Sequence, residues 1–322
     1  MASEPFPLRQ VATIAPPDPA RTWLIESLWL DEGTGVLGGA PKCMKTWIAC
    51  ELALAVASGQ LAFGRFAVHR PGSVICFCAE DSQPVIRERF EALAAARDAS
   101  LRDLPLHLLD VPALRLDRQD ELERLEATVS QAKPRLLVLD PFVRLTRIDE
   151  NSAQEVAQVL GGLRALQRRH QLAILLVHHA RKSAGRSPAQ AFRGSSDFAA
   201  WGDSNLYVTR HRDQLQLTLE HRRAAPPPPL SLQWVETPQP HFLLADACAP
   251  TSAVSNGLAE HLLGLLRDAP HPLSTNALRQ QAHRRKADVV RALAELKAAG
   301  HLEKTSHGWR IRPKQPVPGS QP

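Results

Sequence analysis

The sequence predicts an α/β protein with a mainly parallel central sheet, followed by a small C-terminal domain of helices and a β-hairpin. Three observations support this fold class. Apolar, strand-like runs alternate with helix-like segments over most of the chain. A glycine-containing loop joins the first of these runs to a long helix-like segment. The last part of the chain then changes to a helical pattern and carries the excess of positive charge.

The composition, with 44% hydrophobic and 22% charged residues among 322, is ordinary for a globular protein and allows two domains. No apolar run approaches the roughly 18 residues of a membrane span. Met1 to Thr22 lacks the apolar core of a signal peptide, so we expect a cytoplasmic protein with no membrane partner. The five cysteines form no C-x-x-C pair, which favours buried free thiols over a metal or disulfide site.

The positive charge is concentrated at the C-terminus. Residues 252–322 contain 11 Lys/Arg and 5 Asp/Glu, a net charge of +6. Subtracting these from the 39 Lys/Arg and 33 Asp/Glu of the whole chain leaves 28 of each in residues 1–251. A basic module attached to a neutral one predicts a nucleic-acid partner, because phosphate backbones are the commonest partners of such modules.

The loop between the apolar run at residues 35–37 and the helix-like segment at residues 47–58 predicts a nucleotide site. The unpaired N–H groups of a helix start and a lysine bind phosphates there, while a hydroxyl helps to hold Mg²⁺. Gly39, Lys45 and Thr46 match the pattern G-x-x-x-x-G-K-[ST]. The residues predicted to bind ATP are Gly39, Ala40, Pro41, Lys42, Cys43, Met44, Lys45, Thr46 and Trp47.

Met44 departs from the phosphate-loop pattern, because it stands where the second glycine belongs. A Cβ at that position can crowd the phosphates or strain a backbone that glycine would accept freely. The alternative interpretation of this segment is an ordinary turn between a strand and a helix.

Beyond the loop, strands and helices alternate. We predict strands at residues 73–79, 104–111, 135–139 and 172–177, and helices at 83–97, 118–131 and 152–169. Strands that are apolar on both faces predict a parallel sheet covered on both sides. From residue 204 polar and apolar residues alternate instead, which predicts a hairpin that turns near residues 211–213 and a last strand at 230–235.

Two predicted strands end in carboxylates with the chemistry of nucleotide hydrolysis. We expect Asp140, after the strand at 135–139, to lie beside the phosphate loop and hold Mg²⁺ together with Thr46; the alternative is an Asp that caps the next turn. Glu80 follows the strand at 73–79, which we expect to be adjacent to the strand that leads into the phosphate loop. Glu80 is predicted to be the general base. Asp81 is the alternative base, although the role of a helix N-cap suits it better.

The strand at 172–177 is followed by His178 and His179. We expect one of them to sense the γ-phosphate, with His178 as the first choice. The loop that follows, residues 181–203, is long and basic, and long loops inside compact domains are usually functional. Its basic residues are predicted to follow a nucleic-acid backbone, the alternative being a solvated or subunit-packing loop. They are Arg181, Lys182, Arg186 and Arg193.

The domain boundaries follow from these patterns. We predict an N-terminal extension at residues 1–30, a nucleotide-binding domain at 31–240, a linker at 241–255, a small domain at 256–314 and a disordered tail at 315–322. An apolar patch at residues 23–30 could pack either on its own domain or on a neighbouring subunit.

The small domain has the pattern of a winged helix-turn-helix. Predicted helices at residues 257–267, 274–281 and 286–299 precede a hairpin at 301–312. Arg284, Arg285 and Lys286, at the start of the third helix, are expected to bind duplex DNA. The alternative is a winged helix that docks a protein.

Several of these motifs occur together in the order found in one group of proteins. They are residues 38–46, Glu80-Asp81, residues 136–140, residues 178–182, residues 193–196 and Gly202-Asp203. Through this set of motifs the chain resembles RecA-fold ATPases of the AAA type that are similar to RepA plasmid replicative helicases and DnaB helicases. The resemblance covers roughly residues 30 to 240. The added winged helix goes beyond the minimal RepA plan.

The resemblance implies a ring, often a hexamer, with ATP and Mg²⁺ at subunit interfaces and single-stranded DNA in the channel. It also implies a basic finger from the neighbouring subunit, at the end of a late strand that reads K-x-R. The matching position here is Glu220-His221-Arg222-Arg223, without the lysine, so Arg222 is the first choice and Arg223 the second.

The function expected from the sequence is therefore a ring-forming, DNA-dependent ATPase. Replication of a plasmid or mobile element, as a helicase or DNA-remodelling motor, fits this expectation best. The alternative is a nucleotide-regulated DNA-binding switch in which the winged helix carries the activity.

Overall fold

The structure is a computed structural model, and its chain divides into two compact units, Met1–Asp246 and Ala247–Pro322. The residues that it describes are 6–16, 18, 21–150, 152–179, 196–211, 214–245, 261–282, 289, 292–293, 296–297, 301–305 and 308–311. The two units are described separately below.

The first unit alternates strands with helices, as predicted. Its strands are β1 (Trp23–Ile25), β2 (Trp29–Leu30), β3 (Thr34–Gly39), β4 (Val74–Cys78), β5 (Leu106–Leu108), β6 (Leu136–Asp140), β7 (Ala173–His179), β8 (Ser204–His211), β9 (Gln214–His221), β10 (Leu230–Val235) and β11 (His241–Leu244). Its α-helices are α1 (Lys45–Ser58), α2 (Gln83–Ala95), α3 (Gln119–Ala132), α4 (Ala153–His170) and α6 (Ser196–Trp201). Short 3-10 turns are η1 (Val11–Thr13), η3 (Leu101–Asp103) and η4 (Phe142–Arg144).

A nine-stranded sheet forms the centre of the first unit, in the order β11-β10-β9-β8-β3-β7-β6-β4-β5. From β8 through β3, β7, β6 and β4 to β5 all neighbours are parallel, whereas β8, β9, β10 and β11 pair antiparallel. The predicted hairpin is confirmed, because His211 of β8 pairs with Gln214 of β9. The parallel strands β3, β7, β6 and β4 all end at one edge of the sheet, which we call the C-terminal edge.

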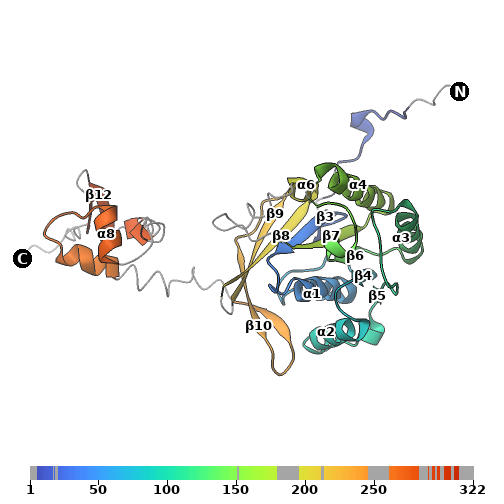
Figure 1. Ribbon diagram of the computed structural model, residues 1–322, viewed down its shortest axis with the longest axis horizontal. Helices are drawn as coiled ribbons and strands as arrows, with labels where there is room; N and C mark the ends of the chain where they lie inside the picture. The colour runs from blue at the N-terminus through green and yellow to red at the C-terminus, as the bar shows by residue number, and fades with distance from the viewer. Residues whose placement is uncertain are drawn as a thin grey trace, which may run out of the picture. The chain divides into compact units, whose positions relative to one another are not determined.

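Two separate cores cover the two faces of the sheet, which confirms the prediction from doubly apolar strands. Successive residues of a strand point to opposite faces, and in β4 Cys76 packs in one core while Ile75 and Phe77 pack in the other. Figure 1 shows α1 and α2 on one face, and α3, α4 and α6 on the other. The thiols of Cys43, Cys50, Cys76 and Cys78 are free, as predicted, and Cys248 lies outside the described residues.

Helix α1 is a core helix, and most of its side chains are buried. It ends at Gly59, whose φ of 72° gives the left-handed cap that glycine accepts without a Cβ clash, as its place in the sequence indicates. Across the part of the chain that the structure describes, no helix has the length and apolar character needed to span a bilayer.

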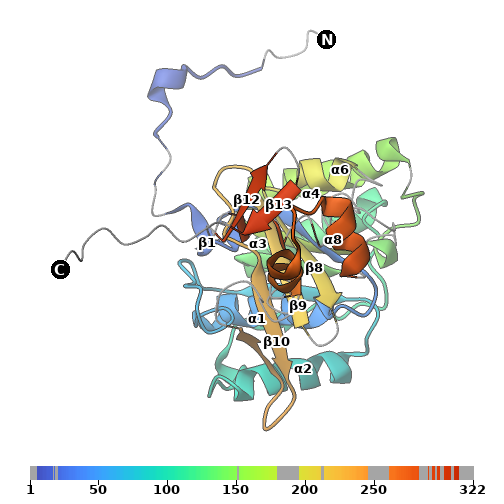
Figure 2. The same cartoon turned by 90° about the vertical axis from the view of Figure 1, so that its left-hand side faces the viewer.

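Aromatic side chains of the antiparallel strands β10 and β11 pack against α1 and the segment after it. Trp234 of β10 packs on Trp47 in the first turn of α1, with ring centroids 4.6 Å apart, and Figure 2 shows β10 beside this helix. Phe242 of β11 packs on Trp234 and Phe63. The predicted linker therefore begins too early: residues 241–244 form an edge strand, because Phe242 completes the aromatic cluster over α1.

The apolar patch near the N-terminus packs on its own domain. Strands β1 and β2 pair antiparallel, and Leu24, Leu28 and Trp29 belong to the same core as α1. The backbone of Leu24 accepts a hydrogen bond of 3.0 Å from His69. Residues 23–30 are therefore part of the first unit's core and not of a separate extension, which decides the alternative left open by the sequence.

Side chains fasten the first half of β3 to the strand beside it. The β3 and β8 backbones pair directly only from Leu37 onward. Before that point, Thr34 N–H donates to Asp203 Oδ2 (3.1 Å) and Val36 N–H donates to Asn205 Oδ1 (3.1 Å). Asp203 is buried and also receives a hydrogen bond from Arg164 of α4. One carboxylate thus ties together β3, β8 and α4.

The second unit has its own apolar core. Its described elements are a helix that includes residues 261–268, α8 (Thr275–Gln281), helical residues within 289–297, and the strands β12 (Leu302–Thr305) and β13 (Gly308–Ile311). Ser274 caps α8 by accepting a hydrogen bond from Ala277 N–H, as its position predicts. β12 and β13 form an antiparallel hairpin, and Trp309 packs in the core with the helices.

Asp203→Asn should destabilise the protein by about 2 kcal/mol near neutral pH, because it leaves the half-buried Arg164 without its carboxylate. Burial raises the pKa of Asp203, but hydrogen bonds from Arg164 and from Thr34 N–H outweigh it and hold the pKa below its usual value. A carboxyl group whose pKa is lower in the folded state than its unfolded-state pKa of about 3.9 stabilises the fold at pH values above the unfolded-state pKa. This contribution is lost as the pH falls through the folded-state pKa.

The free energy of unfolding, measured by urea titration, should therefore differ between wild type and Asp203→Asn by a constant amount from pH 7 to about pH 5, and by less below about pH 4. Asp103→Asn, at an exposed aspartate, is the control and should have little effect. A wild-type-like Asp203→Asn protein at pH 7 would show that this carboxylate does not hold β3 in place.

Candidate functional site at the C-terminal edge of the sheet

The predicted phosphate loop lies between the end of β3 and the start of α1. Ala40, Pro41 and Lys42 are exposed, so the loop backbone faces solvent in front of the free N–H groups of the helix. Gly39 is required by close approach: a Cβ built there would lie 2.6 Å from the carbonyl oxygen of Val208 and 2.6 Å from Cys43 Sγ. The segment therefore has the geometry of a phosphate-binding loop.

Met44 occupies the helix N-cap position in a left-handed conformation, with φ of 64° and ψ of 26°. Glycine adopts this conformation freely, whereas a residue with a Cβ is strained by roughly 1–2 kcal/mol. The Met44 side chain is half-buried and packs against the core that contains α1, which offsets part of that strain. The glycine-like backbone is thus kept although the glycine is not.

Lys45 is buried at the first position of α1, with its amino group turned back onto the loop. Its Nζ donates to the carbonyl oxygen of Ala40 (2.8 Å) and lies 3.8 Å from Cys43 Sγ. Burial lowers the pKa of Lys45, while the neighbouring Cys43, Asp140 and Glu80 oppose that shift. The amino group is therefore held where phosphates bound by the loop would lie.

The sequence predicts that Asp140 lies beside the phosphate loop and holds Mg²⁺ together with Thr46. β7 separates β6 from β3, so the two residues approach each other through α1 and not along neighbouring strands. Helix α1 packs across β7 and β6 and brings the Thr46 hydroxyl close enough to the Asp140 carboxylate to lower its pKa. Burial raises the pKa of Asp140 to about 6, with Thr46 and Lys45 opposing the shift and Glu80 adding to it.

These residues fit a magnesium ion that is shared with a nucleotide. A buried carboxylate with a raised pKa favours a nearby cation, and a hydroxyl and a carboxylate oxygen are ligands that Mg²⁺ accepts. Among the described residues, no group of three or more His, Cys, Asp and Glu side chains could hold a metal ion. Thr46 and Asp140 would therefore supply only part of the coordination, which suits Mg²⁺ because it keeps water and phosphate ligands.

Glu80 follows β4, which is separated from the phosphate-loop strand by β6 and β7 and is not adjacent to it as we expected. It nevertheless lies near Asp140, because Cys78 pairs with Asp140 and Ala79 N–H donates to the Asp140 carbonyl oxygen at 2.7 Å. Its carboxylate is half-exposed at the C-terminal edge. Glu80 therefore lies within the group of charges around the loop.

Asp81 has a different environment from Glu80. Its Oδ2 lies 2.8 Å from Arg89 Nη1 of α2, so its carboxylate is paired with its own helix. Ser82 is the N-cap of α2, so the predicted capping role of Asp81 is wrong. The pairing with Arg89 leaves Glu80 as the better candidate for a group that acts on a water molecule.

The two histidines at the end of β7 point to opposite faces. His178, the first choice from the sequence, stacks on Phe198 with ring centroids 4.3 Å apart and lies beside Phe142. His179 instead approaches Glu80, with 3.7 Å between Nε2 and Oε2. Burial lowers the pKa of His179, as does Lys45, whereas Glu80 opposes the shift. The histidine near the loop is thus His179 and not His178.

Two arginines near the loop were missed by sequence reasoning. Arg144, in η4 just after Asp140, places Nε 3.4 Å from Glu80 Oε1. Arg89 lies over the Trp47 ring at 5.5 Å, close enough to Asp140 to affect its pKa. Arg144 could have been found from its position in the sequence, because a basic residue four places after a strand-ending carboxylate remains near the same edge of the sheet.

Arg222 lies far from the loop of its own chain. It follows β9, and His221 of β9 pairs with Ser204, where β8 begins, so Arg222 is at the edge opposite to the one that carries the loop. Its Nη1 is 3.8 Å from Asp203 Oδ1, and its Nη2 donates to the Ala200 carbonyl oxygen. Arg223 is exposed beside it.

The residues predicted to contact nucleic acid lie outside the described part of the chain. They are Arg181, Lys182, Arg186, Arg193, Arg284, Arg285 and Lys286. Their roles stay predictions.

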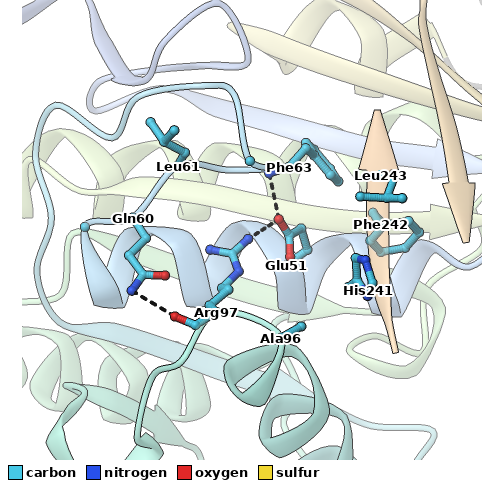
Figure 3. A pocket seen from close by; sticks show the side chains of 11 residues that line it. Glu51, Gln60, Leu61, Phe63, Ala96, Arg97, His241, Phe242 and Leu243 are labelled. Carbon is cyan, nitrogen blue, oxygen red and sulfur yellow. Dashed lines mark hydrogen bonds and ion pairs between the residues drawn. The ribbon is translucent and has the colours of Figure 1, made fainter. Parts of the chain in front are cut away.

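A pocket of about 530 Å³ lies away from the loop, between α1, the turn after it and β11 (Figure 3). Glu51 and Arg97 form a buried ion pair at its wall, and Phe63 N–H donates to Glu51 Oε1 at 2.7 Å. Burial raises the pKa of Glu51, with Arg97 opposing the shift. No phosphate-loop residue lines this pocket, and Gln60, just after α1, donates a hydrogen bond of 3.3 Å to the Arg97 carbonyl oxygen at its wall.

The chain is similar to known proteins in two comparisons. The strand order β8-β3-β7-β6-β4, with the loop after β3 and Asp140 two strands away, agrees with the α/β fold with a mainly parallel sheet that the sequence predicts. A solved structure described as a DnaB-like replicative helicase with its primase interactions is similar to this chain, with a TM-score of 0.49 and 13% sequence identity. The match covers 64% of this chain and 56% of that one, so this chain spans less than two thirds of that helicase.

A family model described as an AAA domain matches residues 2–185. The matched range includes every element from η1 to β7, with the phosphate loop, Glu80, Asp140 and His179, whereas Arg222 and the second unit lie beyond it. Because the matched residues make up more than half of the chain, the protein belongs to the AAA domain family.

Proposed function

We propose that the protein is an ATPase that acts on DNA, with a phosphate loop that binds ATP and Mg²⁺. The observation that carries this proposal is the convergence of Lys45, Thr46, Asp140 and Glu80 at the C-terminal edge of one parallel sheet. Membership of the AAA domain family supports the same activity.

The residues of the site suit the hydrolysis of ATP. Lys45 and the N–H groups at the start of α1 would bind the phosphates, while Thr46 and Asp140 would hold Mg²⁺. Glu80 would take the proton from the attacking water as a new P–O bond forms at the γ-phosphorus. The bond to the β-phosphate oxygen breaks in the same reaction and leaves ADP and phosphate. His179, rather than His178, would contact Glu80 and respond to the γ-phosphate.

DNA is the partner that the charge distribution favours. The second unit combines helices with a two-stranded hairpin, which supports a winged helix-turn-helix that binds duplex DNA through Arg284, Arg285 and Lys286. Single-stranded DNA would contact Arg181, Lys182 and Arg193. A helicase or DNA-remodelling motor that replicates a plasmid or mobile element is the specific role we infer.

A ring, with six subunits as the expected number, would complete the site. The position of Arg222 supports this, because it cannot reach the phosphate loop of its own chain from the opposite edge of the sheet. In a ring it could stabilise the γ-phosphate charge of the next subunit. Its contact with Asp203 is replaceable, since Arg164 also pairs with that carboxylate.

The alternative is a DNA-binding switch that binds nucleotide without using it for movement. Met44 favours it, because a strained residue in the phosphate loop could slow turnover. An ATPase assay with and without single-stranded DNA separates the two functions. The motor requires turnover that rises with DNA, whereas the switch requires DNA binding that changes with nucleotide at negligible turnover.

Glu80→Gln should retain ATP binding but slow hydrolysis by about 10²-fold or more, the loss expected for a general base. Asp81→Asn is the matched control and should hydrolyse ATP at a rate close to wild type, because Asp81 pairs with Arg89. Nucleotide affinity by fluorescence titration and phosphate release measure the two effects. An inactive Asp81→Asn protein beside an active Glu80→Gln protein would reverse the assignment.

Met44→Gly should conserve or raise turnover, because it removes a Cβ from a left-handed backbone position. Met44→Ala is the control. Both variants lose the packing of the methionine side chain, but alanine keeps the Cβ that strains the left-handed backbone, so Met44→Ala should be less stable than Met44→Gly by about 1 kcal/mol. Thermal unfolding and ATPase rates test both variants. A clear loss of turnover in the glycine variant would mean that the methionine side chain itself takes part in nucleotide binding.

Mixing Lys45→Ala with Arg222→Ala should restore part of the ATPase activity that each variant lacks alone. Lys45→Ala spoils the nucleotide site of its own subunit but keeps Arg222, and Arg222→Ala does the reverse. Each interface that pairs an intact loop with an intact arginine would regain a contribution of about 10³ in rate. Failure to restore activity, although light scattering detects mixed oligomers, would exclude Arg222 as a residue that acts on the neighbour; Arg223→Ala then tests the second choice.

A further inference from the structure

Glu80 is engaged on both of its carboxylate oxygens by groups from other elements. Arg144 Nε lies 3.4 Å from Oε1, and His179 Nε2 lies 3.7 Å from Oε2. A general base must have a lone pair within hydrogen-bond reach of its water. An arginine on one of these oxygens therefore competes with the attacking water.

The contact between Arg144 and Glu80 is easily exchanged. The side chains are 63% and 43% exposed, and ion pairs as exposed as this one contribute little stability. A phosphate group can displace the carboxylate, because a guanidinium binds phosphate with two parallel hydrogen bonds. The position of Glu80 thus depends on what else binds Arg144.

The turn that carries Arg144 is fixed by its contacts with the rest of the domain, whereas the Arg144 side chain is exposed. Phe142 is buried and packs edge to face on Phe198, with ring centroids 4.8 Å apart. Arg115 Nη1 donates to the carbonyl oxygen of Arg144 at 3.1 Å. A change of partner at Arg144 therefore requires only rotation about its side-chain bonds.

The same segment has the character of a nucleic-acid contact. Val143 is 45% exposed, and Arg147 is exposed on the same segment. Two arginines beside an exposed apolar side chain, at the edge that carries the phosphate loop, can bind a phosphate backbone. The cation closest to Glu80 is thus also accessible to a strand of DNA.

We propose that Arg144 is a positioning residue that holds Glu80 away from the attacking water until a phosphate of single-stranded DNA takes over its guanidinium. This inference rests on the proposed function, because it names how DNA would regulate the same site. Arg144 acts through Glu80 and contacts neither ATP nor the water. DNA binding and hydrolysis are coupled by exchange of one ion-pair partner.

ATPase rates of the full-length protein, with and without oligo(dT), test this coupling. Arg144→Ala should raise the rate without DNA by roughly two- to fivefold, the factor that an exposed ion pair of up to about 1 kcal/mol allows. The ratio of the two rates should then fall toward one. Arg144→Lys should keep an intermediate ratio. The control is Arg169→Ala, which removes a similarly exposed, ion-paired arginine where α4 leads into β7 at the opposite edge of the sheet, and it should keep the wild-type ratio.

A combined variant shows whether Arg144 acts through Glu80. Glu80→Gln with Arg144→Ala should hydrolyse ATP as slowly as Glu80→Gln alone. Single-stranded DNA, measured by fluorescence anisotropy without nucleotide, should bind Glu80→Gln roughly two- to fivefold more tightly than wild type, because the competing carboxylate is gone. This gain should disappear in the combined variant, and Asp81→Asn should show no gain.

Two results would overturn the inference in distinguishable ways. If wild type is stimulated by oligo(dT) and Arg144→Ala keeps the same ratio with both rates lowered, Arg144 stabilises charge directly and only this inference fails. If wild type hydrolyses ATP at one rate with or without oligo(dT), the proposed DNA dependence fails as well. Circular dichroism confirms folding of each variant before either result is interpreted.

Discussion

The close approach of neighbouring backbones to β3 is the constraint on which the first unit depends. A Cβ at Gly35 would lie 1.6 Å from the Ser204 carbonyl oxygen, so no other residue fits without moving β8. Gly39 is restricted in the same way by Val208. Since β3 lies between β8 and β7 in the middle of the sheet and leads directly into the phosphate loop, the packing of two glycines determines where the loop begins.

Much of this architecture could be predicted from the sequence, because it depends on local patterns. Apolar strands with buried faces, helices between them and the lysine-threonine pair of the loop are all visible in single segments. The order of the strands in the sheet is not local. The sequence places the strands that end at Asp140 and Glu80 after the loop, but only tertiary packing inserts β7 between β3 and β6.

The details of the site were the hardest to predict, because they depend on which way a side chain points. His178 and His179 are adjacent in sequence, yet strand geometry sends one to an aromatic cluster and the other to Glu80. The conformation of Met44 was anticipated as a possible strain, and the left-handed backbone agrees with it. The pairing of Arg144 with Glu80 joins two distant segments, which no pattern within either segment reveals.

The hydrogen bond from Lys45 to the Ala40 carbonyl oxygen has a kinetic consequence. A nucleotide that enters the loop must first break this internal contact, and the amino group that makes it is buried. Association then has an enthalpic barrier in addition to diffusion, and its rate should rise more steeply with temperature than the viscosity of water alone would cause. The lysine that is expected to bind the phosphates is thus also the group that closes the loop against them.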